Sequence, residues 1–207
     1  ILPLANGVFH LDEMEFKPHA RANRNRYVSD IEYEPTAASP RWLEFLQESC
    51  PLYIDFLQEW SGYVLMAGNP WEKLIWLFGP PGTGKSTFIK VLTELLGPMS
   101  RAINLEKVND YTVASLASTK LATVSEISNR VLHTSILKSL ISGDPVQGRH
   151  PYGRPFSVRY QGKLLFASND LPPLDQSEGM FRRLSLIPFE EIPTNADGML
   201  FDKIKAS

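Results

Sequence analysis

The sequence has few of the residues that cross-link small folds or bind metals: one cysteine, Cys50, and four histidines in 207 residues. A single cysteine cannot form an intramolecular disulfide, which excludes a disulfide-stabilised scaffold. There is also no CxxC pair and no His/Cys cluster of the kind that binds zinc. This usage is typical of a reducing compartment. We therefore expect a cytoplasmic protein.

Long apolar runs are also absent. No stretch approaches the roughly 20 residues of a membrane-spanning helix and no signal peptide is visible, so we expect no membrane partner. Charge of one sign does not dominate either, because 21 Lys and Arg stand against 23 Asp and Glu. This balance argues against a protein that coats nucleic acid, but it allows a local basic channel. Because the first residue is Ile1, we expect a fragment of a longer protein.

A glycine-rich loop in the sequence fits the phosphate-binding pattern GxxxxGK[ST]. Its glycines let successive backbone N–H groups turn inward and form an anion-binding concavity. The Lys85 ammonium would reach the β- and γ-phosphates of a nucleotide, and the Ser86 hydroxyl would ligate the bridging Mg²⁺. The residues expected to bind nucleotide are Gly79, Pro80, Pro81, Gly82, Thr83, Gly84, Lys85, Ser86 and Thr87.

The flanks of this loop support the assignment. Residues 74–78 form an uninterrupted apolar run of strand length, as expected for a buried parallel strand. Behind the loop, apolar residues from Phe88 to Leu96 follow helical spacing, and Gly97-Pro98 supplies a stop. Strand, loop and helix therefore occur in the order that aims the helix N-terminus at the phosphates.

The part of the chain before this unit is predicted to be extended and then helical. Asn6-Gly7 indicates a short hairpin, and Ser39-Pro40 and Pro51 begin two short amphipathic helices. Gly68-Asn69-Pro70 is the best candidate boundary. We therefore expect an N-terminal extended and helical region over residues 1–68 and an ATPase core over residues 69–207.

Polar residues follow two further predicted strands. Residues 121–126 are rich in β-favouring side chains and end in Glu126, and the apolar run 164–168 stops at Asn169. In phosphate-loop enzymes an acid at a neighbouring strand tip holds the Mg²⁺ shell or polarises the attacking water. The amide of Asn169 suits a sensor of the γ-phosphate. Whether Glu126 is a metal ligand or a general base stays open.

Positive and aromatic side chains gather in a turn-rich segment after a predicted helix that carries Lys138 and ends at Gly143-Asp144-Pro145. Such groups track a nucleic-acid backbone and stack on bases, although a solvated hairpin would have a similar composition. The candidate DNA-binding residues are Arg149, His150, Tyr152 and Arg154. Further on, Arg182-Arg183 precede the last strand and could supply an arginine finger.

The order of these motifs resembles the superfamily 3 helicases, most closely the branch of phage and plasmid primase-helicases and the poxvirus primase-helicase. The resemblance is carried by VSEIS, LKSLISGDPVQGR, KLLFASNDLP and RRLSLIPF, and by LANGVFHL with PTAASPRWLEFL in front of the core. It extends over roughly residues 4–190. One departure is Ser125, which stands before Glu126 where many members have a second acid.

The resemblance implies a AAA+-like ATPase that forms a ring, usually a hexamer, and moves on single-stranded DNA in the 3′ to 5′ direction. It implies ATP and Mg²⁺ at Lys85 and Ser86, Glu126 as the Walker B acid and Asn169 as the sensor. Lys138 and Asp144 would belong to the motif characteristic of the superfamily. Arg182, with Arg183 as second choice, would be the finger that enters a neighbouring subunit's site.

From these observations we expect an α/β, three-layer P-loop NTPase core with a parallel sheet, preceded by a small helical region. The Asn169 strand should lie between the phosphate-loop strand and the Glu126 strand. The expected function is that of an ATP-dependent helicase motor of a replication protein, with DNA, other copies of the chain and a primase domain or replication partner as partners. Two alternatives stay open: a protein-remodelling ATPase, and an assembly or origin-binding module that does not unwind DNA. Relatives continue beyond the last core strand, so we expect the C-terminal lid to be truncated.

Overall fold

The computed structural model describes residues 1–207 except 24, 26, 126–133, 171–176, 194–196 and 207. The helices are α1 (Pro40–Ser49), α2 (Ile54–Leu65), α3 (Lys85–Leu96), α4 (Asp110–Leu116), α5 (Thr134–Ser142), α6 (Glu178–Phe181) and α7 (Leu200–Ala206). The strands are β1 (Leu2–Leu4), β2 (Gly7–His10), β3 (Glu15–Lys17), β4 (Leu74–Phe78), β5 (Ser100–Ala102), β6 (Leu121–Val124), β7 (Pro145–Gly148), β8 (Phe156–Arg159), β9 (Lys163–Ser168) and β10 (Leu184–Pro188). Short 3₁₀ turns cover Arg21–Asn23, Pro51–Tyr53, Gly97–Met99 and Leu105–Lys107.

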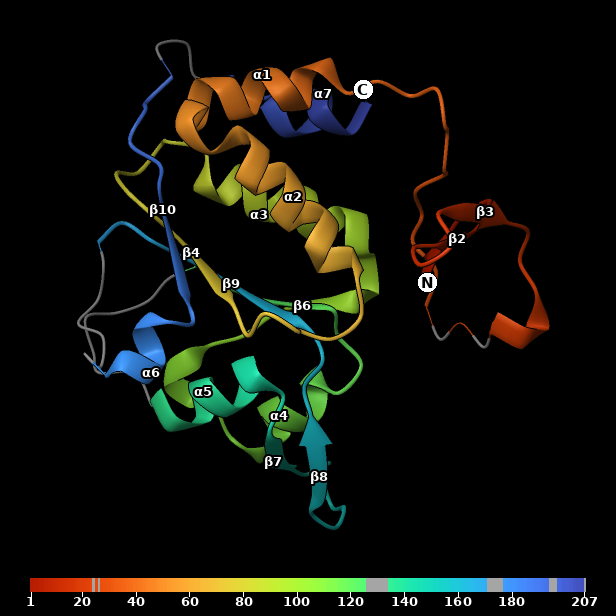
Figure 1. The fold of residues 1–207 in the computed structure, drawn as a ribbon, viewed down its shortest axis with the longest axis vertical. Helices are drawn as coiled ribbons and strands as arrows, with labels where there is room; N and C mark the ends of the chain where they lie inside the picture. Colours follow the sequence, from red (N-terminus) through yellow and green to blue (C-terminus); the bar gives the residue numbers. More distant parts are fainter. Residues whose placement is uncertain (24, 26, 126–133, 171–176, 194–196, 207) are drawn as a thin grey trace.

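A five-stranded sheet in the order β10-β4-β9-β6-β5 forms the centre of the molecule (Figure 1). All four neighbouring pairs are parallel. The strand that ends before Asn169, β9, lies between the phosphate-loop strand β4 and β6, which confirms the predicted order. Because parallel strands end at the same edge, the segments that follow β4, β6 and β9 meet there.

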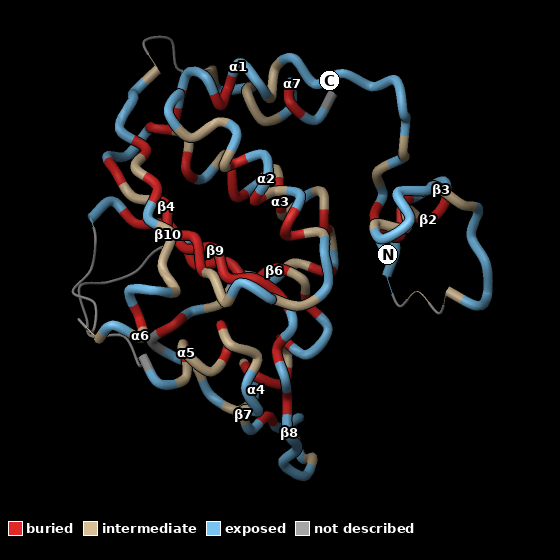
Figure 2. The backbone as a smooth tube through the Cα atoms, viewed as in Figure 1, coloured by how far each residue is buried: buried red, intermediate tan, exposed pale blue. Residues whose placement is uncertain are grey.

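Helices cover both faces of this sheet and give the three layers that the sequence predicts. Alternate residues of β4 point to opposite faces: Ile75 and Leu77 join the core under α1, α2, α3 and α7, whereas Leu74 and Trp76 join the core with α4, α5 and α6. The strand residues 74–77 are fully buried, and Figure 2 shows the sheet as the most buried part of the tube. Burial on both faces explains why β4 reads as a continuous apolar run.

The N-terminal segment begins with a small antiparallel sheet, β1-β2-β3, in which Leu4 pairs with Gly7 across the predicted Asn6-Gly7 turn. Helices α1 and α2 follow and pack on α3. Their buried residues, such as Phe45 and Leu57, share one hydrophobic cluster with Phe88 of α3. The boundary at residue 68 stays a prediction, and this cluster includes residues from both sides of it.

Beyond α4 and α5, β7 and β8 form an antiparallel hairpin at the end of the molecule farthest from α1 and α7 (Figure 1). Val146 pairs with Val158, and the loop between the strands contains the basic and aromatic residues. The hairpin expected from the turn-rich composition is therefore present. Among the described helices, none has the length and apolarity that crossing a lipid bilayer requires.

The half-buried Lys120 and the buried Lys163 close the end of α2. Lys120, just before β6, donates its ammonium hydrogen to the carbonyl oxygen of Leu65. Lys163, the first residue of β9, donates to the carbonyl oxygen of Met66. The Lys163 ammonium also lies 4.4 Å from the ring centroid of Tyr63. Burial, reinforced by the nearby Lys120 charge, lowers the pKa of Lys163 to about 8. These contacts satisfy the last carbonyls of the helix, and their cost is the desolvation of an ammonium group.

The lowered pKa of Lys163 predicts how stability depends on pH. Between about pH 8 and the ordinary lysine range the unfolded chain holds a proton that the folded chain has lost, so stability should rise with pH in this window. We expect the free energy of unfolding of the wild type, relative to Lys163→Met, to rise by roughly 2 kcal/mol from pH 8 to pH 10. Urea unfolding of both proteins across this range measures it, and a flat difference would contradict it.

Candidate functional site

The glycine-rich loop connects β4 to α3 and has the backbone that its glycines predict. Gly79, Gly82 and Gly84 have φ values of 140°, 85° and 97°, a region that favours glycine. Space also requires Gly79, because a Cβ there would lie 2.0 Å from the carbonyl oxygen of Phe189. The loop therefore leaves the sheet in close contact with the end of β10.

Lys85 is the first residue of α3, and its side chain folds back over the loop. Its Nζ donates to the carbonyl oxygens of Gly79 and Pro80 at 2.6 and 2.7 Å, and to Thr83 Oγ1 at 3.3 Å. Lys85 is only 7% exposed, and burial lowers the pKa of its ammonium. The cation is therefore held against oxygen atoms of the loop, and an anion bound beside it would raise its lowered pKa again.

A cavity of about 630 Å³ lies in front of this loop. Its lining joins Lys85, Ser86 and Thr87 from α3 with Ser125 after β6 and Asn169 after β9. Asn169 is also bound to the loop through the backbone, because its carbonyl oxygen accepts from Gly79 N at 3.2 Å. The segments that the sequence assigned to one site therefore converge on one cavity at the carboxyl edge of the sheet.

Glu126, the predicted Walker B acid, lies outside the described residues, and Ser125 marks the place where the chain reaches the cavity. Within the described ranges there is no group of three or more His, Cys, Asp or Glu side chains that could hold a metal ion. Mg²⁺ at nucleotide sites is bound mainly by phosphates, waters and one or two protein oxygens. The exposed Ser86 at the helix N-terminus fits that mode, with Glu126 as the remaining candidate.

One wall of the cavity was not predicted from the sequence. It is built by Arg41, Glu48 and Ser49 of α1 and by Asp197 and Leu200 from the C-terminal segment. Arg41 Nη1 donates to Glu48 Oε1 at 3.1 Å, and Ser49 Oγ is buried without a hydrogen-bond partner among the described residues. The available signal was the seven-residue spacing of Arg41 and Glu48, which puts them on one face of the helix, next to Phe45 and Ser49.

The two candidate finger residues occupy different environments at the amino edge of the sheet, where β10 begins. The side chain of Arg183 is 11% exposed and forms an ion pair with Glu72 at 2.9 Å. The side chain of Arg182 is 66% exposed and lies 4.0 Å from the same carboxylate. Arg182 is therefore the one available to another molecule, and Arg183 is engaged within its own subunit.

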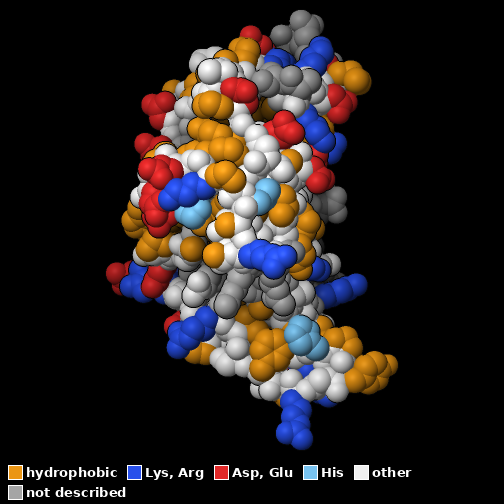
Figure 3. Space-filling model, turned by 90° about the vertical axis from the view of Figure 1, so that its right-hand side faces the viewer, with side chains coloured by type: hydrophobic (Ala, Val, Ile, Leu, Met, Phe, Trp, Pro, Cys, Tyr) orange, Lys and Arg blue, Asp and Glu red, His pale blue; other side chains and the backbone are white. Residues whose placement is uncertain are grey.

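The four candidate DNA-binding residues are brought together at the tip of the β7-β8 hairpin. Arg149 Nε donates to the carbonyl oxygen of Gly153 at 3.1 Å and closes the loop, and the His150 ring stacks on Phe156 at 5.0 Å. Tyr152 is fully exposed with a φ of 60°, and Arg154 is exposed beside it. Figure 3 shows basic, histidine and hydrophobic side chains side by side on this lower projection.

Lys138 lies on α5, the helix before this hairpin, and Asp144 lies between α5 and β7. Lys138 Nζ donates to Ser177 Oγ at 2.8 Å, just before α6. Asp144 is exposed, and its backbone N donates to the carbonyl oxygen of Ser139 at 2.9 Å, which closes the end of α5. Neither residue lines the nucleotide cavity.

Two family models match the sequence. The model described as "Family of unknown function (DUF5906)" matches residues 77–183, just over half of the chain. The model described as "D5 N terminal like" matches residues 1–51. Among curated proteins, the AAA-ATPase At3g28510 of Arabidopsis thaliana is 37% identical over 79 residues, which are 38% of this chain and 12% of that protein.

Solved structures share the fold at low sequence identity. The A-form apo structure of the NrS-1 C-terminal region superposes with a TM-score of 0.66 at 14% identity, over 84% of this chain and 44% of that one. JCV helicase, solved with an acetamide compound bound, gives a TM-score of 0.53 at 14% identity, over 80% and 48% of the two chains. This chain thus spans less than half of either solved relative.

These likenesses agree with the resemblance to superfamily 3 helicases and primase-helicases that the motif order indicated. Because the solved structures are only 14% identical to this chain, they show a shared fold. Because the DUF5906 model matches more than half of the chain, the chain belongs to the DUF5906 family, a family of unknown function.

Proposed function

We propose that this chain is the ATPase motor of a replicative helicase, which hydrolyses Mg·ATP between the subunits of a ring and moves along single-stranded DNA. The observation that carries the proposal is the single cavity shared by Lys85, Ser125 and Asn169. Phosphate-loop enzymes need a cradle, an acid and a γ-phosphate sensor around one triphosphate. Here Lys85 and Asn169 line the cavity, and Ser125, the residue before the proposed acid Glu126, reaches it as well.

In the proposed reaction each part of the cavity has a distinct task. The N–H groups of the glycine loop and the Lys85 ammonium would hold the β- and γ-phosphates, so Lys85 would exchange its contacts with loop carbonyls for contacts with phosphate oxygens. Bound Mg²⁺, held by Ser86 and Glu126, would neutralise charge that develops on the phosphates. The Asn169 amide would orient the attacking water and the γ-phosphate.

The α1 wall fits the remaining part of the nucleotide. It lies beyond the α3 N-terminus and combines the apolar Phe45 and Leu200 with the unpaired hydroxyl of Ser49. A base or ribose needs an apolar surface and a few fixed polar groups, which this wall offers. We therefore assign the nucleoside to the space between α1 and the segment that leads into α7.

A second subunit would complete the site. Arg182 stands at the amino edge of the sheet, one strand length from the loop of its own chain, or about 13 Å along β4 at 3.3 Å per residue. It therefore cannot reach its own triphosphate. An exposed arginine there is suited to a neighbour's site, where it would stabilise transition-state charge.

Lys85→Ala should weaken ATP binding by about 100-fold, because a charge-assisted contact to phosphate is lost from a partly dehydrated cradle. Lys90→Ala, an exposed residue further along α3, is the matched control and should leave the affinity unchanged. Fluorescent-nucleotide titration measures both variants. Equal affinities for the wild type and Lys85→Ala would contradict the assignment of the site.

Tyr152→Ala should weaken binding of single-stranded DNA by roughly tenfold, since one stacked base contributes about 1–3 kcal/mol.

Arg154→Ala should lower the slope of log affinity against log salt concentration by about 0.7, the value for one phosphate contact on a single strand. Arg101→Ala, an exposed arginine on β5, is the control for the change in charge. Anisotropy titration of a labelled oligonucleotide at several salt concentrations measures these effects.

The same experiment separates the helicase from its alternatives. If ATP hydrolysis is insensitive to single-stranded DNA and the hairpin variants bind DNA like the wild type, a protein-remodelling ATPase is favoured. If nucleotide drives oligomer formation but the oligomer does not separate strands, the assembly module is favoured.

A further inference from the structure

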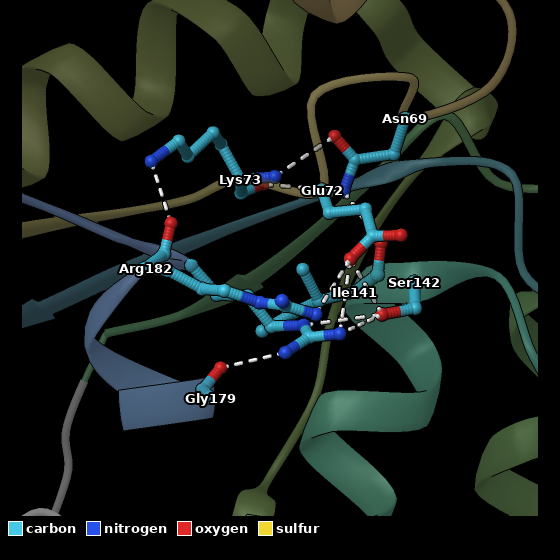
Figure 4. A network of polar contacts seen from close by, with 8 residues as sticks. Asn69, Glu72, Lys73, Ile141, Ser142, Gly179 and Arg182 are labelled. Carbon is cyan, nitrogen blue, oxygen red and sulfur yellow. Dashed lines mark hydrogen bonds and ion pairs between the residues drawn. The ribbon is translucent and has the colours of Figure 1, made fainter. Parts of the chain in front are cut away.

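A polar cluster at the amino edge of the sheet joins three segments that are far apart in the sequence (Figure 4). Glu72 belongs to the turn before β4, Ser142 ends α5, and Arg183 precedes β10. We refer to these three residues as the Glu72 cluster. It lies away from the nucleotide cavity, and no step of the proposed reaction uses it.

Each side chain of the cluster contacts the other two. Arg183 Nη2 donates to Glu72 Oε2 at 2.9 Å and to Ser142 Oγ at 2.6 Å, and Ser142 Oγ donates to Glu72 Oε2 at 3.0 Å. Arg183 Nη1 also donates to the carbonyl oxygen of Gly179 in α6 at 2.6 Å. Charge-assisted hydrogen bonds from a planar guanidinium are directional, so the cluster fixes the orientation of Arg183 as well as its position.

The same turn holds the main chain of Arg182. Lys73 Nζ donates to the carbonyl oxygen of Arg182 at 2.6 Å, and Leu74 N donates to that of Arg183 at 2.8 Å. Among the described residues, in contrast, the one side-chain partner of the exposed Arg182 guanidinium is Glu72, at 4.0 Å. Figure 4 shows Lys73 and Glu72 on the side of the turn that faces Arg182. The backbone at Arg182 is therefore fixed while its side chain can reach outward.

The backbone of Glu72 supports a dedicated role for its carboxylate. Glu72 has a φ of 49°, a conformation that glycine adopts without strain and glutamate rarely does. The turn is held by Glu72 N, which donates to Asn69 O at 2.9 Å, and by Asn69 Nδ2, which donates to Ile141 O at 2.9 Å. Strained residues of this kind persist where the surroundings over-determine them, often next to functional groups.

We propose that Glu72 and Arg183 are positioning residues that hold Arg182 in the orientation needed to enter the site of a neighbouring subunit. This inference rests on the proposed function, because it needs a shared site. Glu72 would act twice: it anchors Arg183, and its charge attracts the Arg182 guanidinium, whose Nη2 lies 4.0 Å from Glu72 Oε2. Through Ser142 the same carboxylate fixes the end of α5, from which the chain enters the DNA hairpin.

Mixed oligomers test the proposal. A Lys85→Ala subunit has a defective site and an intact finger, whereas an Arg182→Ala subunit has an intact site and no finger, so mixing the two should restore ATP hydrolysis. Adding Glu72→Gln to the Lys85→Ala subunit should lower the restored rate by roughly tenfold, since misplacing a catalytic group by about 1 Å can cost on the order of 100-fold. Adding Glu72→Gln to the Arg182→Ala subunit should change nothing. Glu59→Gln, an exposed glutamate on α2, is the control in both subunits.

The outcomes are distinguishable. A loss confined to the finger-donating subunit, with an unchanged KM for ATP and an unchanged melting temperature, supports the positioning role. An equal loss in both subunits shows a general structural role, and no loss in either shows that Glu72 is dispensable; both results overturn the inference and leave the proposed function intact. If the parent mixture restores no activity, there is no shared site, and the inference and the intersubunit mechanism fail together.

Discussion

The main-chain hydrogen bonds around Gly79 are the constraint on which the candidate site depends. Gly79 N donates to Asn169 O at 3.2 Å, and Phe189 N donates to Phe78 O at 2.7 Å, so β4 is held between β9 and β10 where the glycine loop begins. The approach leaves no room for a Cβ on Gly79. The loop and Asn169 are thus placed together by the backbone, before any side chain contributes. The parallel register of these buried strands therefore determines where the glycine loop meets Asn169, which is where the proposed triphosphate would be held.

The two edges of the sheet separate two tasks. The carboxyl edge carries the cavity with Lys85 and Asn169, and the amino edge carries the Glu72 cluster with Arg182. Between them lie strands whose residues are buried on both faces, a closely packed layer that does not deform easily. In the proposed ring, such a sheet would fix the distance between the cavity of a subunit and the arginine that it provides to a neighbour.

The features that could be predicted from the sequence depend on local pattern or on backbone chemistry. The run before the loop, the glycines, the Asn6-Gly7 turn and the basic hairpin were each visible because a strand buried on two faces, a positive φ or a tight turn restricts residue type over a few positions. The order of β4, β9 and β6 followed from the resemblance and is confirmed. The α1 wall and the Glu72–Arg183 pair were not found, because each joins segments more than 100 residues apart, and the motif that contains Arg183 does not indicate its partner.

The distribution of positive charge explains why composition could not identify a DNA-binding surface. Lys85, Lys120, Lys163 and Arg183 all donate to carbonyls or to a carboxylate within the chain, so these cations are engaged in the fold and not presented on the hairpin. The hairpin, by contrast, presents Arg154 and Tyr152 exposed at the tip of a projection whose base packs on α4. The net charge of −2 counts the cations engaged within the fold and the exposed cations of the hairpin alike. Dissolved salt limits the range of a surface charge to about 8–10 Å at physiological ionic strength. A DNA strand at the hairpin would therefore respond to these few exposed groups and not to the net charge of the whole chain.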